Sequence, residues 1–403
     1  MDSHQILFFI ALMLVSARLF SEVARRLNIP SIIGELAAGI VLGPTLLGWI
    51  EPNEVLRLLA EIGIILLLFE VGLETDIEKL MKAGPQAVVL ALAGFVLPFI
   101  LGFCVTYYIF GLSLIISLFI GGTLTATSIG VTVRILSSLG RHRSIEGQIV
   151  LGAAVIDDVL GVLLLAILYE FVTIGTVSVA NAGSVILFIV LFFILAPVFA
   201  KIVSLQIKRY QNLTDTPGFI PVMLVALVLT MASFAHQIGA PELLGGFAAG
   251  IALSRRFILP FAAALKTDEE FTRRISDEMK PIIQLFTPLF FVMVGLSLDF
   301  SVIDWSSVFI WSFSLSLVAV AILGKLIAGW LLPVPFRQRT VIGMAMVPRG
   351  EVGLIFAELG RAAGILVNEV YAGLVIVIAY TTLLAPFWIK WYYQRYGEKL
   401  SRD

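Results

Sequence analysis

The sequence predicts an all-α, polytopic membrane protein, and three observations support that fold class. Of the 403 residues, 59% are hydrophobic and only 14% are charged, and the mean hydropathy is +1.03, unlike a soluble globular chain. Apolar runs of about twenty residues, the length of a transmembrane helix, recur along the whole chain. Two segments of the first half return in the same order in the second half. We therefore expect one integral membrane domain, 1–403, with an internal duplication.

About thirteen membrane spans are expected when the apolar runs are divided at Pro, Gly and charge clusters. They lie near 4–24, 31–49, 57–73, 86–110, 113–137, 147–172, 183–207, 218–237, 241–256, 280–297, 306–332, 339–361 and 367–391. Basic residues such as Arg25 and Arg141 fall in the connections on one side, whereas Glu51 and Glu369 fall on the other. The positive-inside rule places the N-terminus outside the cell (inner) membrane and the C-terminus in the cytoplasm. The charged connection 265–279 is expected to form a separate short interfacial helix.

The charge balance and the cysteine content exclude several classes of function. Lys and Arg total 27 against 28 Asp and Glu, for a net charge of -1, so the chain has no basic field for nucleic acid. The single cysteine, Cys104, excludes an internal disulfide and a cysteine-based metal site. We expect no cofactor, and membrane lipid as a general partner.

The internal repeat consists of two pairs of matching segments. Pro30–Leu42 matches Pro241–Leu253, and Val71–Asp76 matches Val294–Asp299. Shared small-residue helix packing could explain either match alone, but two matches in order indicate duplication. An odd number of spans separates the copies, so they enter the bilayer in opposite directions. The repeats then cover approximately 1–172 and 212–403, joined by a helix near 183–207, and inverted repeats of this kind are typical of secondary transporters.

Each repeat contains one segment that is expected to break its helix inside the membrane. The stretch 121–130 is rich in Gly and in hydroxyl side chains, and 347–353 contains Pro, two Gly and two charges. Irregular backbone at membrane depth is tolerated only where it is buried in protein or lines a wet cavity. If the breaks cross, their half-helix ends carry fixed partial charges that nearby side chains can compensate. The candidate groups at this crossover are Thr125, Thr127, Ser128, Arg349 and Glu351.

Two adjacent carboxylates, Asp157 and Asp158, lie within the apolar stretch 147–172. A charge at bilayer depth costs roughly 2.5–3.5 kcal/mol, so such a pair indicates an ion site. Lys325 lies inside another span and needs an acidic partner. Neighbours on a helix point about 100° apart, so we expect one carboxylate to face Lys325 and the other to face the crossed breaks. Protons and a hard cation would compete for these oxygens. For Glu35, a further carboxylate within an expected span, a structural role is expected.

The chain resembles the monovalent cation:proton antiporter-2 family, and in particular bacterial Na⁺/H⁺ antiporters. The resemblance covers essentially the whole chain and rests on four motifs in order, which are Asp157-Asp158 after Gly-Ala-Ala-Val-Ile, Thr-Ala-Thr-Ser at 125–128, Gly324-Lys325, and Pro-Arg-Gly-Glu-Val-Gly at 348–353. It implies a dimerisation domain and a six-helix core, which includes the spans near 86–172 and 306–391 and contains the crossed broken helices. It also implies elevator-type alternating access by a homodimer.

The resemblance also assigns roles to the site residues. Asp158 would be the principal carrier of Na⁺ and protons, assisted by the hydroxyls of Thr127 and Ser128. Asp157 would form a salt bridge with Lys325 that breaks when the cation binds. The double-aspartate form is associated with electrogenic exchange of two protons for one sodium, and no residue is expected to be catalytic. Related potassium efflux proteins usually have Gln in place of the first aspartate and a cytoplasmic nucleotide-binding domain, which we do not expect in this chain.

Other classes of membrane protein fit the sequence less well. Aspartate-rich membrane prenyltransferases need a further acid at the fifth motif position, where this chain has Gly161, and intramembrane aspartyl proteases need a Gly-x-Gly-Asp motif that is absent here. A cation channel could use the same carboxylates, but it would not couple cation flow to proton counterflow. Within the antiporter class, K⁺ or Li⁺ could replace Na⁺, because selectivity depends on cavity geometry.

Overall fold

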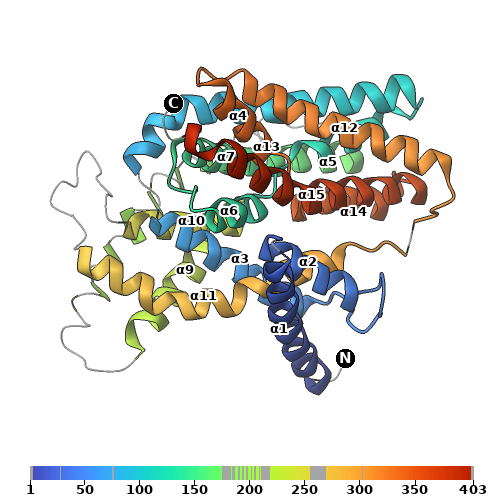
Figure 1. Ribbon diagram of the computed structural model, residues 1–403. Helices are drawn as coiled ribbons and strands as arrows, with labels where there is room; N and C mark the ends of the chain where they lie inside the picture. Colours follow the sequence, from blue (N-terminus) through green and yellow to red (C-terminus); the bar gives the residue numbers. More distant parts are fainter. Residues whose placement is uncertain are drawn as a thin grey trace. The chain divides into compact units, whose positions relative to one another are not determined.

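The chain is all-helical in the part that the structure describes, which confirms the predicted fold class. The computed structural model (Figure 1) describes residues 3–27, 29–74, 77–174, 218–254, 269–301 and 303–400, with scattered residues between 183 and 209. Its helices are α1 (Ser3–Arg26), α2 (Ser31–Leu42), α3 (Glu54–Glu74), α4 (Ile77–Cys104), the π-helical turn η1 (Val105–Ile109), α5 (Leu114–Thr125), α6 (Ile129–Ser138), α7 (Ile145–Ile174), α9 (Phe219–Gln237), α10 (Glu242–Leu253), α11 (Glu269–Ser297), α12 (Val308–Trp330), α13 (Phe336–Ala345), α14 (Glu351–Ala362) and α15 (Asn368–Leu400).

The helices agree with a protein that crosses the membrane many times. Eight spans in the described residues are long and apolar enough to cross a bilayer, and α2 and α10 are shorter apolar helices. The difference from about thirteen arises because the other expected spans are short, interrupted or, like α3, carry charges along their length. The expected span at 183–207 lies largely outside the described residues.

One expected boundary is wrong. The charged segment 265–279 was expected to form its own short helix, but α11 runs without interruption from Glu269 to Ser297. The charged residues from 269 onward are therefore the first turns of a long helix. Pro281 and Pro288 lie inside α11 and do not end it, because neighbouring groups can satisfy a backbone group freed by proline in a membrane protein. Residues 265–268 lie outside the described part.

The chain divides into two compact units, which are described separately. Unit 1 comprises Met1–Ile10, Asn53–Lys82 and Ser178–Phe290, and unit 2 comprises Ala11–Pro52, Ala83–Val177 and Phe291–Asp403. Both segments of the predicted core, near 86–172 and 306–391, fall in unit 2, together with most of α1 and all of α2. The further division into a core and a dimerisation domain stays a prediction.

The matched repeat segments form two equivalent helix crossings, one in each unit. In unit 2, α2 crosses the end of α11, where a Cβ added to Gly39 would lie 2.8 Å from the Cα of Gly295. In unit 1, α10 crosses α3, where a Cβ on Gly250 would lie 2.9 Å from the Cα of Gly72. Gly39 corresponds to Gly250 in the first match, and Gly72 corresponds to Gly295 in the second. Each repeat thus contributes one glycine to each crossing, which lets the backbones touch.

Candidate functional site

The first helix break separates α5 from α6. Ala126 has an extended backbone, with φ −64° and ψ 136°, and Ser128 caps the new helix by accepting a hydrogen bond from Val131 N at 3.4 Å. A serine N-cap satisfies a backbone N–H that has no partner inside the helix. The hydroxyl-rich sequence therefore both ends α5 and starts α6. The break falls within the expected stretch 121–130.

The second break separates α13 from α14 and falls within the expected stretch 347–353. Pro348 has no N–H and disfavours helical backbone at Val347, so α13 cannot continue. Gly350 precedes the first residue of α14. A Cβ on Gly350 would lie 2.5 Å from Ser128 Oγ and 2.7 Å from Ser128 Cβ. Glycine is therefore required here because the two breaks touch.

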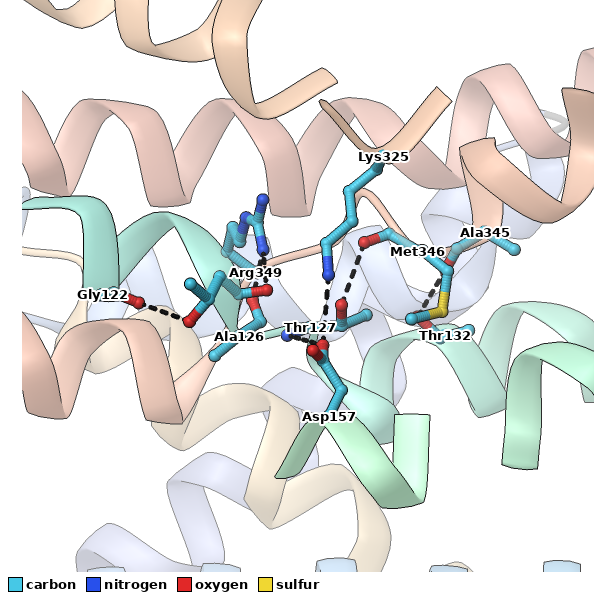
Figure 2. A network of polar contacts seen from close by, with 10 residues as sticks. Gly122, Ala126, Thr127, Thr132, Asp157, Lys325, Ala345, Met346 and Arg349 are labelled. Atoms are coloured by element: carbon cyan, nitrogen blue, oxygen red, sulfur yellow. Dashed lines mark hydrogen bonds and ion pairs between the residues drawn. The ribbon is translucent and has the colours of Figure 1, made fainter. Parts of the chain in front are cut away.

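The two breaks cross, and hydrogen bonds hold them together (Figure 2). Ser128 N donates to Pro348 O at 2.9 Å. The hydroxyl of Thr127 donates to Met346 O at 3.1 Å, and the hydroxyl of Thr132 donates to Ala345 O at 2.9 Å. The carbonyls at the end of α13, which have no partner within their own helix, are thus satisfied by side chains of the other repeat.

Arg349 compensates the negative end of α5. Its side chain is fully buried, and Nη1 donates to Thr125 O at 2.9 Å and to Ala126 O at 2.5 Å. A cation is favourable at a helix C-terminus because the exposed carbonyls carry partial negative charge. The main-chain carbonyl of Arg349 in turn accepts a hydrogen bond from Thr382 on α15. Arg349 therefore ties the second break to the first break and to α15.

Asp157 on α7 lies between the lysine and the first break. Its Oδ2 accepts from Lys325 Nζ at 3.2 Å and from Thr127 N at 2.9 Å, as Figure 2 shows. Both charged side chains have 0% exposure. The amide of Thr127 precedes α6, so the carboxylate also sits at the positive end of that half-helix. The sequence predicts that one aspartate faces Lys325 and the other faces the crossed breaks. In the structure, a single oxygen of Asp157 contacts both Lys325 and the first break. Asp157 Oδ1 has no hydrogen-bond partner among the described residues.

Asp158 is buried beside this network, with 2% exposure. It acts on Lys325 electrostatically, but less strongly than Asp157 does. Because consecutive helical residues point about 100° apart, Asp158 faces a direction different from that of Asp157. The site thus contains two carboxylates against two buried cations, Lys325 and Arg349, with no exposed charge among them.

The side chains of the remaining predicted residues do not contact Asp157 or Lys325 through any hydrogen bond described above. The hydroxyl of Thr125 donates to Gly122 O within α5 at 2.7 Å, so only the carbonyl of Thr125 takes part in the crossing. The hydroxyl of Ser128 caps α6, and its amide donates to Pro348 O in the second break. Glu351 begins α14, but its side chain lies outside the described part.

Two residues of the site were not found by sequence reasoning. Thr132 resembles any β-branched residue in a helix, and its bond to the other break is visible only in the fold. Gly94 on α4 lies against the lysine, where an added Cβ would be 3.5 Å from Lys325 Nζ. A small residue beside an intramembrane charge is a weak signal, because small residues are common at membrane helix contacts.

The chain is similar in sequence to a known protein family along nearly its whole length. A family model described as "Sodium/hydrogen exchanger, transmembrane" matches residues 10–395. The chain is 32% identical to the high-affinity Na⁺/H⁺ antiporter NhaS3 of Synechocystis, with 93% of this chain and 87% of that protein covered. It is 35% identical to the Na⁺/H⁺-K⁺ antiporter GerN of Bacillus cereus, with 95% of each covered.

A solved structure has the same fold. The sodium proton antiporter MjNhaP1 of Methanocaldococcus jannaschii superposes with a TM-score of 0.70 at 17% identity, covering 100% of this chain and 99% of that one. At this identity the likeness shows the fold alone. The family match extends over nearly the whole chain and includes both breaks, Asp157, Asp158 and Lys325. The chain therefore belongs to the sodium/hydrogen exchanger family of monovalent cation:proton antiporters, which are membrane transporters and not enzymes.

Proposed function

We propose that this protein exchanges Na⁺ for protons across the cell membrane, with Asp158 as the carrier and the Asp157–Lys325 pair as the coupling element. The observation that supports it is the buried lysine held 3.2 Å from Asp157 at the crossing of the two breaks. A buried charge is costly unless it is paired. A cation that reaches Asp157 and Asp158 competes with the lysine for the same oxygens.

The proposed exchange follows from charge balance within the site. In the proton-loaded form, Asp158 carries a proton and Lys325 is an ammonium paired with Asp157. When Na⁺ binds, Asp158 releases its proton, and Lys325 loses its partner and its proton. Two protons then leave for one Na⁺, and the carboxylate and amine groups with their bound ions change from net charge zero to minus one. The proposed exchange is therefore electrogenic.

The proposed movement is of the elevator type, in which the core shifts as one body. The hydrogen bonds between the breaks support this, because Thr127, Thr132 and Arg349 each join one repeat to the other. Half-helices that are fastened in this way move together and carry the site with them. We further propose a homodimer, with the N-terminus outside and the C-terminus in the cytoplasm.

Na⁺ is the proposed main substrate, and K⁺ is the alternative. Relatives named as Na⁺/H⁺ antiporters support Na⁺, whereas the name of GerN includes K⁺ as well. Li⁺ is a third monovalent ion to compare. Because protons and the cation compete for the same carboxylates, the half-saturating cation concentration should rise as the pH falls, by up to about tenfold per pH unit for each competing proton.

The test is a dye-reported pH gradient in vesicles after addition of Na⁺, K⁺ or Li⁺. The parent should dissipate the gradient, Asp158→Asn should not, and Lys280→Ala, which changes an exposed lysine on α11, should behave as the parent. Undiminished cation-dependent proton movement in Asp158→Asn would refute the proposed carrier. A second measurement imposes a membrane potential. The parent rate should depend on the potential, and this dependence should be lost in Lys325→Ala.

A further inference from the structure

A second ion pair lies apart from the candidate site, and it is buried on its acidic side alone, because the Arg134 side chain is 29% exposed. Glu35 on α2 is 1% exposed, and its Oε1 lies 3.4 Å from Arg134 Nη2 on α6. The hydroxyl of Ser21 on α1 donates to the same oxygen at 3.3 Å. Arg18, also on α1, is a further charge that acts on Glu35. The Glu35–Arg134 pair therefore connects the hairpin of α1 and α2 to the half-helix α6.

The contacts of this pair are long and incomplete. Oε2 of Glu35 and Nε of Arg134 are buried and have no hydrogen-bond partner among the described residues. Arginine–carboxylate pairs are frequently bidentate, with two short hydrogen bonds. Here the buried carboxylate of Glu35 has one long contact with the arginine, at 3.4 Å, and a buried charge is costly when its remaining acceptors are not satisfied. The two side chains are therefore held loosely in this conformation.

The second copy of the internal repeat has no carboxylate at the place of Glu35. In the match of Pro30–Leu42 with Pro241–Leu253, Glu35 corresponds to Gly246, while Gly34 and Gly39 correspond to glycines. Gly246 packs closely against the backbone of Ile65. The second repeat thus builds the same helix without a side chain at this place. The carboxylate of Glu35 is present in the first of the two matched segments alone, and its partner is on a broken helix.

The position of Arg134 connects the pair to the ion site. Arg134 is six residues beyond the N-cap Ser128, about 9 Å along the axis of α6. The opposite end of this short helix presents the Thr127 amide to Asp157. In the predicted division, α6 belongs to the core and α2 lies outside it. Both helices belong to unit 2, but in the predicted division a link from α2 to α6 joins the part that moves to the part that stays.

We infer that the Glu35–Arg134 pair is a latch, which holds α2 and α6 together in one end state of the transport cycle and opens in the other. This inference rests on the proposed elevator-type exchange. Its consequence is that α2 and α6 must separate once per cycle. A covalent bond at this position stops turnover without removing the cation site, and loss of either charge changes the balance between the two end states.

The first test joins the two positions covalently. In a Cys104→Ala background, Glu35→Cys/Arg134→Cys is oxidised, or bridged with a short bifunctional thiol reagent, in vesicles that report Na⁺-driven proton movement. Exchange should stop and return after reduction, while the Na⁺-dependent rise in thermal stability persists because the site is intact. The control, Trp330→Cys/Thr340→Cys, joins side chains of α12 and α13 that are in contact within the predicted core, and its exchange should continue.

The outcomes separate the latch from the proposed function. If the parent exchanges and the joined 35–134 protein does so equally fast, the latch is refuted. If the parent itself shows no cation-driven proton movement, the proposed function fails and the latch fails with it.

A second test does not depend on cross-linking. Glu35→Gln, Arg134→Gln and the double variant form a cycle read by the half-saturating Na⁺ concentration. Each single change should shift it by roughly two- to tenfold, and the double variant by less than the product of the two, because the pair acts as a unit. A merely structural pair would lower the thermal midpoint and leave the half-saturating concentration unchanged. Unchanged or strictly independent shifts would therefore contradict the latch.

Discussion

Replacing Lys325 by alanine removes one partner of a fully buried ion pair and leaves the other in place. The 3.2 Å separation corresponds to an attraction of about 5 kcal/mol at an effective dielectric constant of about 20. The cost of burying both charges offsets much of this attraction in the parent. In Lys325→Ala, Asp157 keeps the hydrogen bond from the amide of Thr127 and the electrostatic attraction of Arg349, but it loses its hydrogen-bonded cation. Loss of one partner from a buried pair costs about 3–5 kcal/mol. We expect a loss of unfolding free energy in that range.

The assay is unfolding of the purified protein in detergent at neutral pH, without Na⁺, with Lys280→Ala as the matched control. An exposed lysine makes little difference, so the control should lie within about 0.5 kcal/mol of the parent. Asp157→Asn/Lys325→Ala removes both charges together and should recover much of the loss, because a buried pair contributes little net stability over neutral groups.

Two results would refute this reasoning. Lys325→Ala could unfold at the same midpoint as the parent, which would mean that the pair is not desolvated. Alternatively, the double variant could be less stable than Lys325→Ala, which would mean that Asp157 is stabilised by groups other than the lysine.

Three further predictions concern the crossing of the breaks. Arg349→Gln leaves two α5 carbonyls without their cation and should lower stability by about 1.5–3 kcal/mol in the same unfolding assay; an unchanged midpoint would show that α5 needs no compensating charge. Gly350→Ala places a Cβ 2.5 Å from Ser128 Oγ and should weaken Na⁺-dependent thermal stabilisation, whereas Gly84→Ala, where a Cβ meets nothing within 4 Å, should not; equal behaviour of the two would contradict the contact. Thr132→Val removes the bond to α13 and should cost about 1–3 kcal/mol because a buried carbonyl loses its donor, and Thr230→Val, on an exposed face, should cost clearly less.

Much of the fold could be predicted because its causes are local in sequence. Pro348 cannot continue α13, Gly350 lies directly before α14, and hydroxyl groups at 121–130 cap a new helix, so both breaks were placed correctly. The matched segments of the repeat indicated the duplication, but that they cross at glycines, α2 with α11 and α3 with α10, is seen only in the structure. The start of α11, by contrast, was predicted wrongly. The charges at 265–279 favoured a separate helix at the membrane surface, but nothing in the sequence after Glu269 ends a helix, and α11 continues to Ser297.

The site could be predicted less completely because its contacts join distant parts of the chain. The costs of burial identified Asp157, Asp158, Lys325 and Arg349 as residues that need partners. They did not show that one oxygen of Asp157 serves both Lys325 and the Thr127 amide, which depends on the rotation of α7 about its axis. Nor could the pairing of Thr132 with α13 be found, since a hydroxyl finds a partner within its own helix equally well.

The two repeats have the same arrangement of helices, but the helix that follows each break carries a different polar group. After the first break, α7 presents a carboxylate, and Asp157 accepts a hydrogen bond from the Thr127 amide. After the second break, α15 presents Thr381 and Thr382 at mid-helix, both fully buried, and Thr382 donates to the carbonyl of Arg349. A hydroxyl satisfies a carbonyl without a net charge, whereas the carboxylates need a cation. The repeat symmetry thus supplies two crossed breaks but only one set of acidic side chains, which favours one cation site for each copy of the chain.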